Sequence, residues 1–585
     1  MKAISYYNEL FTILFLLLAG AAIAMNYVKR QTPAAVADDG LTKGSTPKDL
    51  KKEELIFFGM LLFAFLLRTW KFGLIPGGMN QDGAMAAVDA KALADYGTDR
   101  FGTFLPTHFE AWGFAQMNVF MSYCMVPFFK LFGMNVLTTR LPVLLFSMFG
   151  LVALYFVGRR LLDVRGAQIL LAFAACNPWH FMQSRWALES NMLPHAFLLG
   201  FCFLLMGLEG KRRWLYLSMI WFALCMYCYG IAFYTVPVFL IFMAGYLLIK
   251  KLLNWWEIAI CVLLYALISW PIYLTMAINA FGWKTMRTFF CTMPYFKDSV
   301  RSKDILFFSD NVSAQLGKNL EAVKKVYLEG DGLPWNSMNG IGVMAKCFLP
   351  FVLLGLIACA YKLIHEGDPR KKAGQVALLA FFAIANLSGI ITAQVNVNRI
   401  NILHYSLLIL VAYGMQYAIK GIPNAKYLIL ASYLILSVLF LGTYFTQHAR
   451  VLEKYYYHDF LEAVEYAADE EVSSCTRFVI TPDTQYAGSK VVSEILTMYA
   501  LDVDARYYQG FGVDENGLTY AEKFRYVNFM LRDVDPDAPV AYVFKTALLT
   551  PEVKEALEGD GSDGYCVVSF GEYSTAMPRK CLRAK

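Results

Sequence analysis

The chain has 585 residues, of which 58% are hydrophobic and 17% charged, and its formal net charge is +6. This apolar content exceeds the roughly 45–50% that is usual in soluble proteins and predicts a membrane protein. The Lys and Arg residues lie in short clusters between apolar runs and form no continuous basic face, which argues against nucleic acid as a partner. The twelve cysteines lie mostly inside apolar segments, so we expect neither a structural zinc site nor a disulfide framework.

The chain contains about twelve apolar runs of the length needed to cross a membrane, which is about 20 residues. They lie near residues 8–28, 54–71, 138–158, 167–182, 191–209, 214–229, 231–249, 257–277, 342–362, 374–393, 401–418 and 425–446. The first run lacks a Lys/Arg-rich start and a clear small-residue cleavage site, so it predicts a retained helix and not a cleaved signal peptide. We expect residues 1–53 to form an extra N-terminal transmembrane helix with a cytoplasmic linker, and residues 54–446 to form the main transmembrane domain.

One further run, Ala115 to Met134, is placed by charge. If it lies flat in the membrane interface, every later basic cluster falls on one side, which the positive-inside rule identifies as the cytoplasm. These clusters are Arg159, Arg160 and Arg165; Lys211, Arg212 and Arg213; Lys250 and Lys251; Arg370, Lys371 and Lys372; and Lys420 and Lys426. If the run spans, all of them are translocated while the Lys-rich loop 43–52 stays inside. An interfacial helix is therefore expected in the first outer loop.

This topology places four segments on the outer face of a multi-pass cell-membrane protein. They are the loop 73–137, the turn around Arg185, the loop 279–341 and the tail after residue 447. Residues 447–585 read as an extracytoplasmic α/β domain, with helical patterns at 458–468, 489–500 and 551–558 and strand-like runs at 476–481, 504–508, 541–545 and 565–570. A small open parallel sheet is expected there.

The first outer loop carries the first candidate catalytic residue, Asp82. It follows Gly77, Gly78, Met79, Asn80 and Gln81, and it begins a helical pattern that runs to Tyr96 and ends at Gly97. An Asp at a helix start is commonly an N-cap, which is the structural alternative. His108 and Glu110 follow on the same loop, and Glu110 is a second candidate for acid/base work. Asp82 and Glu110 would also be the ligands if a divalent metal binds; two solvated loop carboxylates are the alternative.

Two further polar segments lie at the outer ends of spans. In Ser184 to Asn191, Arg185 and Glu189 are four residues apart, which permits either an ion pair across one helical turn or contact with a substrate. Asn398, Arg399 and His404 stand at the start of a late span, where an Arg can bind a phosphate in a bidentate manner or simply anchor the helix at the interface. Arg68 lies at the outer end of the second span, where it either snorkels or points into a polar site.

Three stretches together resemble a known family. They are "GGMNQDGAMAAVDAKALADYGTDRFGTFLP", "LFGMNVLTTRLPVLLFSMFGLVALYFVGRRLL" and "NPWHFMQSRWALESN". They resemble the bacterial branch of the GT-C glycosyltransferases, and more specifically the protein O-mannosyltransferases and lipid A aminoarabinose transferases of glycosyltransferase family 39. The resemblance covers roughly residues 54–420. It implies a GT-C-like transmembrane catalytic domain over 54–446.

The resemblance also implies the roles of individual residues. Asp82 stands where this family has its proposed catalytic Asp, although Gly83 follows it here in place of the usual Glu. Glu110 matches a Glu of the aminoarabinose branch, whereas Met85 and Ala111 occupy the places of two cations. Arg68, Arg185 and Arg399 are the available replacements, with His108, Glu189, Asn398 and His404 as further candidates for substrate binding.

The chemistry that follows is hexosyl or pentosyl transfer, with inversion, from a polyprenyl-phosphate donor at the outer leaflet. Asp82 would deprotonate an acceptor hydroxyl on a protein, a cell-wall polymer or a lipid, while cations stabilise the departing phosphate. No cofactor is required with certainty, although a divalent metal is compatible. A nucleotide-sugar enzyme is disfavoured, because Asp502 to Asp504 and Asp533 to Asp535 are DxD triplets of a kind that occurs freely in loops.

Two alternatives stay open. A multi-pass transporter or lipid flippase would have a similar number of spans, but its polar residues usually lie near the membrane midplane, whereas the informative charges here gather at outer helix ends. The loop 279–341 is rich in aromatic residues and has an amphipathic stretch near 313–328. It could act as a lid over a lipid-facing cleft, or it could be a structured loop packed against the tail.

Overall fold

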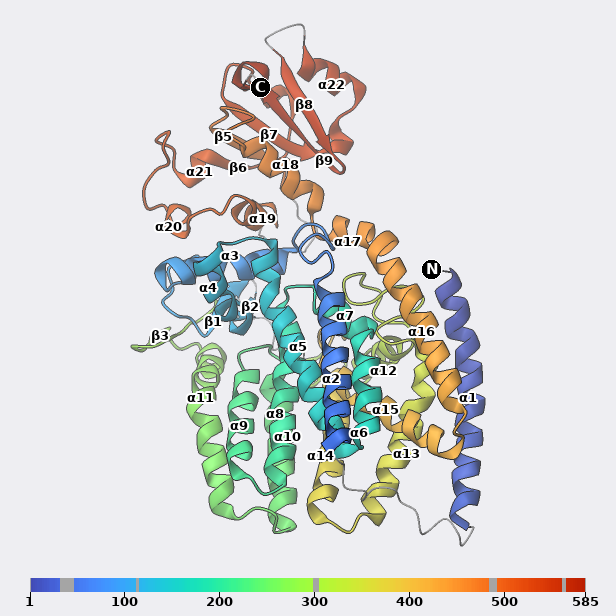
Figure 1. The fold of residues 1–585 in the computed structure, drawn as a ribbon. Helices are drawn as coiled ribbons and strands as arrows, with labels where there is room; N and C mark the ends of the chain where they lie inside the picture. Colours follow the sequence, from blue (N-terminus) through green and yellow to red (C-terminus); the bar gives the residue numbers. More distant parts are fainter. Residues whose placement is uncertain are drawn as a thin grey trace. The chain divides into compact units, whose positions relative to one another are not determined.

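The computed structural model describes residues 2–31, 47–111, 115–297, 305–482, 492–559 and 564–583 (Figure 1). The chain forms two compact units. The first, which we call the helical unit, comprises Met1–Phe72, Val143–Tyr273 and Arg301–His448. The second, the tail unit, comprises Gly73–Pro142, Leu274–Val300 and Ala449–Lys585. The tail unit therefore contains both the predicted C-terminal domain and the first outer loop.

The helical unit is built almost entirely of apolar helices. They are α1 (Lys2–Gln31), α2 (Pro47–Thr69), α5 (Val136–Leu161), α6 (Val164–Ala175), α7 (Pro178–Gln183), α8 (Met192–Leu208), α9 (Arg212–Cys225), α10 (Ala232–Ile249), α11 (Trp255–Phe281), α12 (Val312–Leu328), α13 (Leu349–His365), α14 (Pro369–Ile391), α15 (Leu403–Gly421) and α16 (Ala425–Thr443). Eight helices among the described residues are long and apolar enough to span a membrane. The predicted spans fall on helices, but the run 167–182 is divided between α6 and α7. A multi-pass membrane protein is confirmed.

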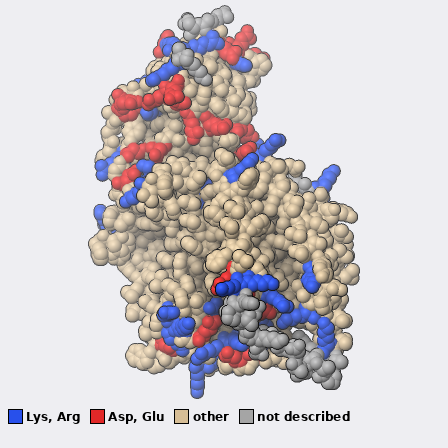
Figure 2. Space-filling model, viewed as in Figure 1, with Lys and Arg blue, Asp and Glu red and all other residues tan. Residues whose placement is uncertain are grey.

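Basic residues mark one end of the helical unit. Ion pairs join the helix ends there: Arg160 lies 2.9 Å from Glu209, Arg159 lies 3.1 Å from Glu53, and Arg212 pairs with Glu257. Figure 2 shows Lys and Arg side chains gathered at this end, around the loops that join α10 to α11 and α13 to α14 in Figure 1, while uncharged residues cover the sides of the helices. The clusters that the sequence placed on one side of the membrane therefore do lie at one end of the unit.

Glycines allow α13 and α15 to pack very closely. A Cβ atom on Gly355 would lie 2.0 Å from the carbonyl oxygen of Leu410, and one on Gly414 would lie 1.9 Å from that of Phe351. Small residues at such crossings let two backbones meet in a membrane, where the hydrophobic effect between helices is weak and packing dominates. The pair α13 and α15 therefore depends on these two glycines.

The tail unit combines two helices of the first outer loop with a small α/β domain. The loop contributes α3 (Gln81–Tyr96), β1 (His108–Ala111), β2 (Ala115–Asn118) and α4 (Phe120–Phe132), and a later hairpin contributes β3 (Met286–Arg287) and β4 (Thr292–Met293). The tail contributes α17 (Ala449–Tyr455), α18 (His458–Ala468), β5 (Arg477–Ile480), α19 (Val492–Ala500), α20 (Ala505–Tyr508), α21 (Tyr520–Lys523), β6 (Phe524–Tyr526), β7 (Val540–Lys545), α22 (Pro551–Glu558), β8 (Tyr565–Phe570) and β9 (Tyr573–Pro578).

The five strands of the tail form one sheet in the order β6-β5-β7-β9-β8. β5 is parallel to both of its neighbours, with Phe478 opposite Phe524 on β6 and Ala541 on β7, whereas β9 runs antiparallel to β7 and β8. One side of the sheet buries a cluster that includes Tyr542, Phe544 and Leu557 of α22. Helix α18 contacts β7, β8 and β9 (Figure 1).

The structure corrects three details of the predicted tail and loop. The sheet is mixed and not parallel, because Gly571 at φ 56° turns the chain back after β8 and adds β9 as a hairpin partner. Residues 504–508 form a helix and not a strand, because the Asp504 side chain accepts hydrogen bonds from the amides of Arg506 and Tyr507 and caps α20. Residues 115–118 form a strand, so the helix predicted over Ala115 to Met134 begins only at Phe120. Part of the helix predicted at 489–500, residues 489–491, lies outside the described residues.

We predict that Gly414→Ala lowers the free energy of unfolding by about 1–3 kcal/mol, the usual range for overpacking a tight contact. The added methyl group would have to displace the backbone of α13. Thermal unfolding of the purified protein in detergent tests this, with Gly245→Ala on α10 as control, because a Cβ there meets no atom within 4 Å. Equal melting temperatures for the two variants would contradict the close-packing role of Gly414.

Candidate active site

The turn that leads into α3 is clamped from two sides within the tail unit. Arg140 donates to the carbonyl oxygens of Pro76 (2.8 Å) and Gly78 (2.6 Å), and the amide of Met79 donates to the carbonyl of Tyr456 (2.7 Å). Gly78 has φ 74°, and a Cβ on it would lie 2.2 Å from the Tyr456 oxygen. Only glycine fits there, so the clamp fixes where the following residues can lie.

Asp82 does not cap α3, because Asn80 has that role. The Asn80 side chain accepts a hydrogen bond from the amide of Gly83 (2.9 Å), and Asp82 is the second residue of the helix, with a half-buried side chain. The N-terminus of a helix carries a partial positive charge that stabilises a carboxylate in the first turn. The predicted end of the helix is confirmed, since Gly97 adopts φ 69° and closes the last turn on Leu93. The structural alternative for Asp82, helix capping, is therefore wrong.

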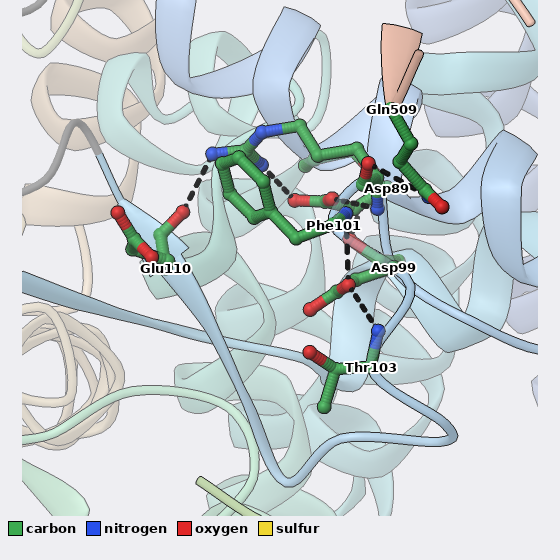
Figure 3. Close-up of polar contacts among 9 residues, drawn as sticks. Asp89, Asp99, Phe101, Thr103, Glu110 and Gln509 are labelled. Atoms are coloured by element: carbon green, nitrogen blue, oxygen red, sulfur yellow. Dashed lines mark hydrogen bonds and ion pairs between the residues drawn. The ribbon is translucent and has the colours of Figure 1, made fainter. Parts of the chain in front are cut away.

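A buried ion pair connects α3 to the rest of the loop. The Asp89 carboxylate is fully buried and pairs with the Arg100 guanidinium, and it also accepts a hydrogen bond from the Arg100 amide at 3.0 Å. Burial raises the pKa of Asp89 to about 7, although the charge of Arg100 opposes this shift. Figure 3 shows how Asp99 then closes the adjacent turn, accepting from the amides of Phe101 (3.0 Å) and Thr103 (2.8 Å).

The same arginine positions the second candidate carboxylate. Arg100 donates through Nη2 to the backbone oxygen of Glu110 (2.6 Å), which lies on β1 (Figure 3). β1 pairs antiparallel with β2 and buries His108, Phe109 and Ala111. Glu110 is half-buried and shares one face of the strand with His108. The structure thus brings His108 and Glu110 together on one strand, and it places Asp82 at the start of α3 in the same unit.

The helical unit contains a second polar centre around Arg68, which is fully buried. Arg68 donates to the carbonyl oxygens of Ala64 (3.1 Å) and Ala175 (2.9 Å) and to Nδ1 of His180 (2.8 Å). Because a guanidinium only donates, His180 accepts at Nδ1, and its Nε2–H donates to the Tyr405 hydroxyl at 2.9 Å.

Tyr405 and a glycine complete this centre. The Tyr405 hydroxyl, which receives the His180 proton, donates in turn to Nδ1 of His195 at 2.7 Å. Gly150 on α5 makes room for both groups, because a Cβ there would lie 2.2 Å from the Tyr405 hydroxyl and 2.6 Å from that nitrogen. Arg68, His180, Tyr405 and His195 form one chain of hydrogen bonds, which we call the Arg68 chain.

Arg185 lies next to this chain and is itself buried. It donates to the carbonyl oxygens of Arg68 (2.5 Å) and Lys71 (3.0 Å), and its guanidinium lies 5.4 Å from the ring centre of Phe445. An ion pair of Arg185 and Glu189 across one helical turn was one of two alternatives, and the structure has no continuous helix from Arg185 to Glu189. α7 ends at Gln183, residues 184–188 form a turn, and Glu189 begins a separate short helical turn, Glu189–Asn191.

One of the late-span candidates, His404, contacts Trp179. Its indole Nε1–H donates to the side chain of Asn401 (2.7 Å), and its ring lies 4.8 Å from that of His404. His404 is buried at the start of α15, next to Tyr405 of the Arg68 chain. Asn398 is half-buried, and Arg399 donates to the carbonyl oxygen of Ala393 at 2.6 Å. Arg68, Arg185 and His404 thus lie close to shared neighbours, and the roles of all the predicted site residues stay predictions.

Two other features noted in the sequence, a DxD triplet and an amphipathic stretch, make contacts that stabilise the fold. Asp504, from a DxD triplet, caps α20 and also accepts a hydrogen bond from Tyr96. The amphipathic stretch near 313–328 is α12, which packs on α14 through the hydrogen bond from Asn319 to the Ile390 carbonyl (2.8 Å). In the part of the chain that the structure describes, no group of three or more His, Cys, Asp or Glu residues is arranged to hold a metal ion.

Several polar residues near these centres were not predicted. His180, His195 and Tyr405 stand inside apolar runs, where a single His or Tyr is usually a core residue. His180 did lie in the stretch "NPWHFMQSRWALESN", and Tyr405 directly follows His404. Membership of that stretch was the available signal for His180, and the adjacent His404 was the available signal for Tyr405. No signal in the sequence pointed to Asp89 and Arg100, because neither their spacing nor the local composition distinguishes them from other charged residues of the loop.

Comparison with known proteins agrees with this architecture. Residues 119–277, about a quarter of the chain, match the family described as dolichyl-phosphate-mannose-protein mannosyltransferase. The chain is similar to the crystal structure of ArnT from Cupriavidus metallidurans bound to undecaprenyl phosphate, with 12% identity, a TM-score of 0.52, and coverage of 90% of this chain and 98% of that one. No curated protein sequence matches the chain.

A weaker similarity extends to the oligosaccharyltransferase of Archaeoglobus fulgidus in its apo form, with 12% identity, a TM-score of 0.45, and coverage of 86% of this chain and 71% of that one. AglB from the same organism, in complex with an inhibitory peptide and a dolichol-phosphate, has 13% identity, a TM-score of 0.43, and coverage of 91% and 75%. The predicted resemblance to the GT-C membrane glycosyltransferases is confirmed as one of fold, with a C-terminal domain that contains strands. The bacterial branch stays a prediction.

The Asp89 and Arg100 pair gives a pH prediction. The folded-state pKa of Asp89, about 7, lies above its unfolded value of about 4. Between about pH 4 and pH 7, Asp89 therefore keeps its proton in the folded protein and loses it in the unfolded chain. The free energy of unfolding should therefore fall as the pH rises from about 4 through about 7. Melting temperatures in detergent across this range, relative to Asp89→Asn, test it. If wild type gains stability over Asp89→Asn as the pH rises, Arg100 keeps Asp89 ionised and the prediction is wrong.

Proposed function

We propose that this chain, which has the fold of the GT-C membrane glycosyltransferases, transfers a sugar from a polyprenyl-phosphate donor to an acceptor at the outer face of the membrane. The match of residues 119–277 to a dolichyl-phosphate-mannose-dependent family supports a lipid-linked donor. The fold shared with ArnT bound to undecaprenyl phosphate agrees with it. The acceptor is a hydroxyl of a protein, a wall polymer or a lipid.

The observation that carries the proposal is the division of roles between Asn80 and Asp82. Asn80 accepts a hydrogen bond from the Gly83 amide, so Asn80 and not Asp82 is the N-cap of α3. The clamp by Arg140 and the close approach at Gly78 fix the turn before it. A carboxylate placed by so much surrounding structure fits a general base, for which geometry is the first requirement.

The reaction follows from one base. An Asp82 oxygen takes the proton of the acceptor hydroxyl, whose oxygen attacks the anomeric carbon of the donor sugar. The bond between that carbon and the phosphate oxygen breaks, and the polyprenyl phosphate leaves with the bonding electrons. Attack opposite the leaving group inverts the anomeric configuration. Glu110 and His108, on one face of β1, are suited to orient the acceptor through hydrogen bonds.

The negative charge that develops on the phosphate requires cations. Arg68, Arg185 and Arg399 of the helical unit are our candidates for this role, with Glu189, Asn398 and His404 as polar neighbours of the sugar or phosphate. An arginine can hold two phosphate oxygens at once through its planar fork of donors. Stabilisation of a leaving group in a site that excludes water is usually a large part of catalysis.

Asp82→Asn should lower the rate of glycosyl transfer by at least about 100-fold, because general-base catalysis contributes about that factor or more. The assay follows donor consumption by purified protein in detergent, with short-chain polyprenyl-phosphate sugars. Asp95→Asn is the control, since Asp95 lies on the same helix and its partner is Lys91 at the protein surface. Thermal unfolding must show that both variants are folded.

Two outcomes would overturn the proposal. If Asp82→Asn consumes donor at the wild-type rate, Asp82 is not the base. If wild type consumes no donor from a broad panel but moves a polyprenyl-phosphate sugar across liposomes, the protein is a transporter or flippase.

The orientation in the membrane is tested separately. Phe289 in the tail unit is 91% exposed and Ile364 at the basic end of α13 is 70% exposed, whereas all twelve native cysteines are buried or half-buried. A membrane-impermeant maleimide should label Phe289→Cys on intact cells and label Ile364→Cys only after the membrane is opened. The reverse pattern would place the tail unit in the cytoplasm and contradict an extracytoplasmic site.

A further inference from the structure

The tail unit has an open pocket of about 830 Å³ that is distinct from Asp82 and from the Arg68 chain. The stretch after α3 forms one wall, and the segments α19, α20, α21 and β6 of the tail form the others. Aromatic side chains dominate its lining: Phe101, Tyr508, Phe511, Tyr520, Phe524 and Tyr526. This volume lies within the range of about 300–1,000 Å³ that is typical of small-molecule sites.

The rings form a connected row with exposed members at its edge. Phe101 lies 6.1 Å from Tyr508, which lies 5.1 Å from Tyr520, which in turn lies 5.3 Å from Phe524, all between ring centres. The buried rings Tyr520 and Phe524 form the base, while Phe101 and Phe511 are exposed. The exposed rings of Phe101 and Phe511 offer flat apolar surfaces to a ligand that enters from solvent.

The backbone around Phe511 keeps its side chain exposed to solvent. Gly510 and Gly512 flank it at φ 86° and 90°, values that residues with a side chain rarely adopt. The amide of Phe511 donates to the carbonyl of Arg506 at 2.9 Å, which ties the tip of this loop to α20. As a result, Phe511 keeps 69% of its surface exposed although it is large and apolar.

Polar groups stand among these rings. Glu494 lines the pocket, and burial, followed by the charge of Glu494, raises the pKa of Tyr508 to about 12. The hydroxyls of Tyr520 and Tyr526 lie 3.0 Å apart. Gln509 also lines the pocket and donates through Nε2 to the carbonyl oxygen of Arg100 (3.0 Å), a contact that does not use its amide oxygen. The pocket therefore combines ring faces with a carboxylate, an amide and hydroxyls.

We propose that this pocket binds a saccharide unit of the acceptor, so that the acceptor is a glycan. Sugar rings present aliphatic C–H faces that stack on aromatic rings, and their hydroxyls donate to carboxylates and amide oxygens. A cationic ligand fits less well, because Arg100 already lies 4.5 Å from the centre of the Phe101 ring and Lys523 lies 5.9 Å from that of Phe524. These two cations would repel a third at the same ring faces.

That the bound glycan is the acceptor rests on the proposed transfer reaction. Binding of a saccharide in this pocket does not depend on catalysis and can be measured separately. Arg100 connects the two. It pairs with Asp89 of α3, the helix whose second residue is Asp82, and it donates to the backbone oxygen of Glu110. Its own carbonyl oxygen accepts from Gln509 of the pocket wall. The glycan site and the candidate catalytic carboxylates are therefore built on one framework within the tail unit.

The test measures binding of fluorescein-labelled oligosaccharides to the full-length protein in detergent, with no donor present. The probes are neutral tetrasaccharides of glucose and mannose, chitotetraose and an acidic oligogalacturonate. Wild type should bind at least one of them, and Phe511→Ala and Glu494→Gln should each weaken that binding by about tenfold or more. Phe289→Ala, which removes another exposed phenylalanine of the same unit, should bind as wild type does.

The outcomes separate this inference from the proposed function. Asp82→Asn should bind the oligosaccharide normally while transfer is lost. If no probe binds, or if Phe511→Ala and Glu494→Gln both bind as wild type does, the pocket assignment is wrong, even where donor turnover persists. Competition by choline in place of sugars would show a cation site and also overturn it. Binding without any transfer from a lipid-linked donor would leave the pocket standing and refute the proposed reaction.

Discussion

The buried contact of Arg100 with Asp89 organises the whole first outer loop. The Arg100 side chain pairs with Asp89 in the middle of α3 and donates to the backbone of Glu110 on β1. The Arg100 backbone also contacts Asp89, and its carbonyl oxygen accepts from Gln509 at the end of α20. Removing one partner of a buried ion pair leaves an uncompensated charge and costs about 3–5 kcal/mol. The Arg100 guanidinium also lies over Phe101. Arg100 thus joins α3, β1 and the tail within the tail unit, while a second cation, Arg140, holds the turn before α3.

In the helical unit a buried arginine, Arg68, is stabilised without a carboxylate partner. Arg68 is completely buried, and the described donors of its Nη atoms go to two backbone carbonyls and to the neutral nitrogen of His180. Neutral acceptors disperse the charge among dipoles, and the chain through Tyr405 to His195 fixes the direction of each hydrogen bond in turn. Gly150 is required because Tyr405 and His195 fill the space that its side chain would take. Polar residues within an apolar bundle usually have a functional reason to be retained, since each is costly there.

Hydrophobic length and charge predicted the spans, the clustering of basic loops at one end and the presence of an α/β tail, because each of these depends on composition over many residues. Details that depend on one contact were missed. Asp504 turns a strand-like run into α20 by capping it, and β9 escaped notice because its buried Ser574 and Thr575 weaken the apolar pattern. Asp82 and Glu110 were selected from a motif, but Asp89 and Arg100 were not. Their importance arises from burial and pairing between residues eleven apart in a loop, which no local pattern reports.

The start of α3 shows how structural and chemical roles are kept apart in neighbouring residues. A carboxylate that caps a helix accepts a hydrogen bond from a backbone amide, and such a bond to the charged form makes it a weaker base. In this chain Asn80, which carries no charge, takes the amide of Gly83, and Gly78 permits the backbone approach to Tyr456 that Arg140 reinforces. The ionisable residue then comes two positions later, within the field of the helix N-terminus. A turn so constrained on either side leaves few ways to place the Asp82 carboxylate, and pre-organisation of that kind is what a reaction with one base and a mobile lipid-linked donor requires.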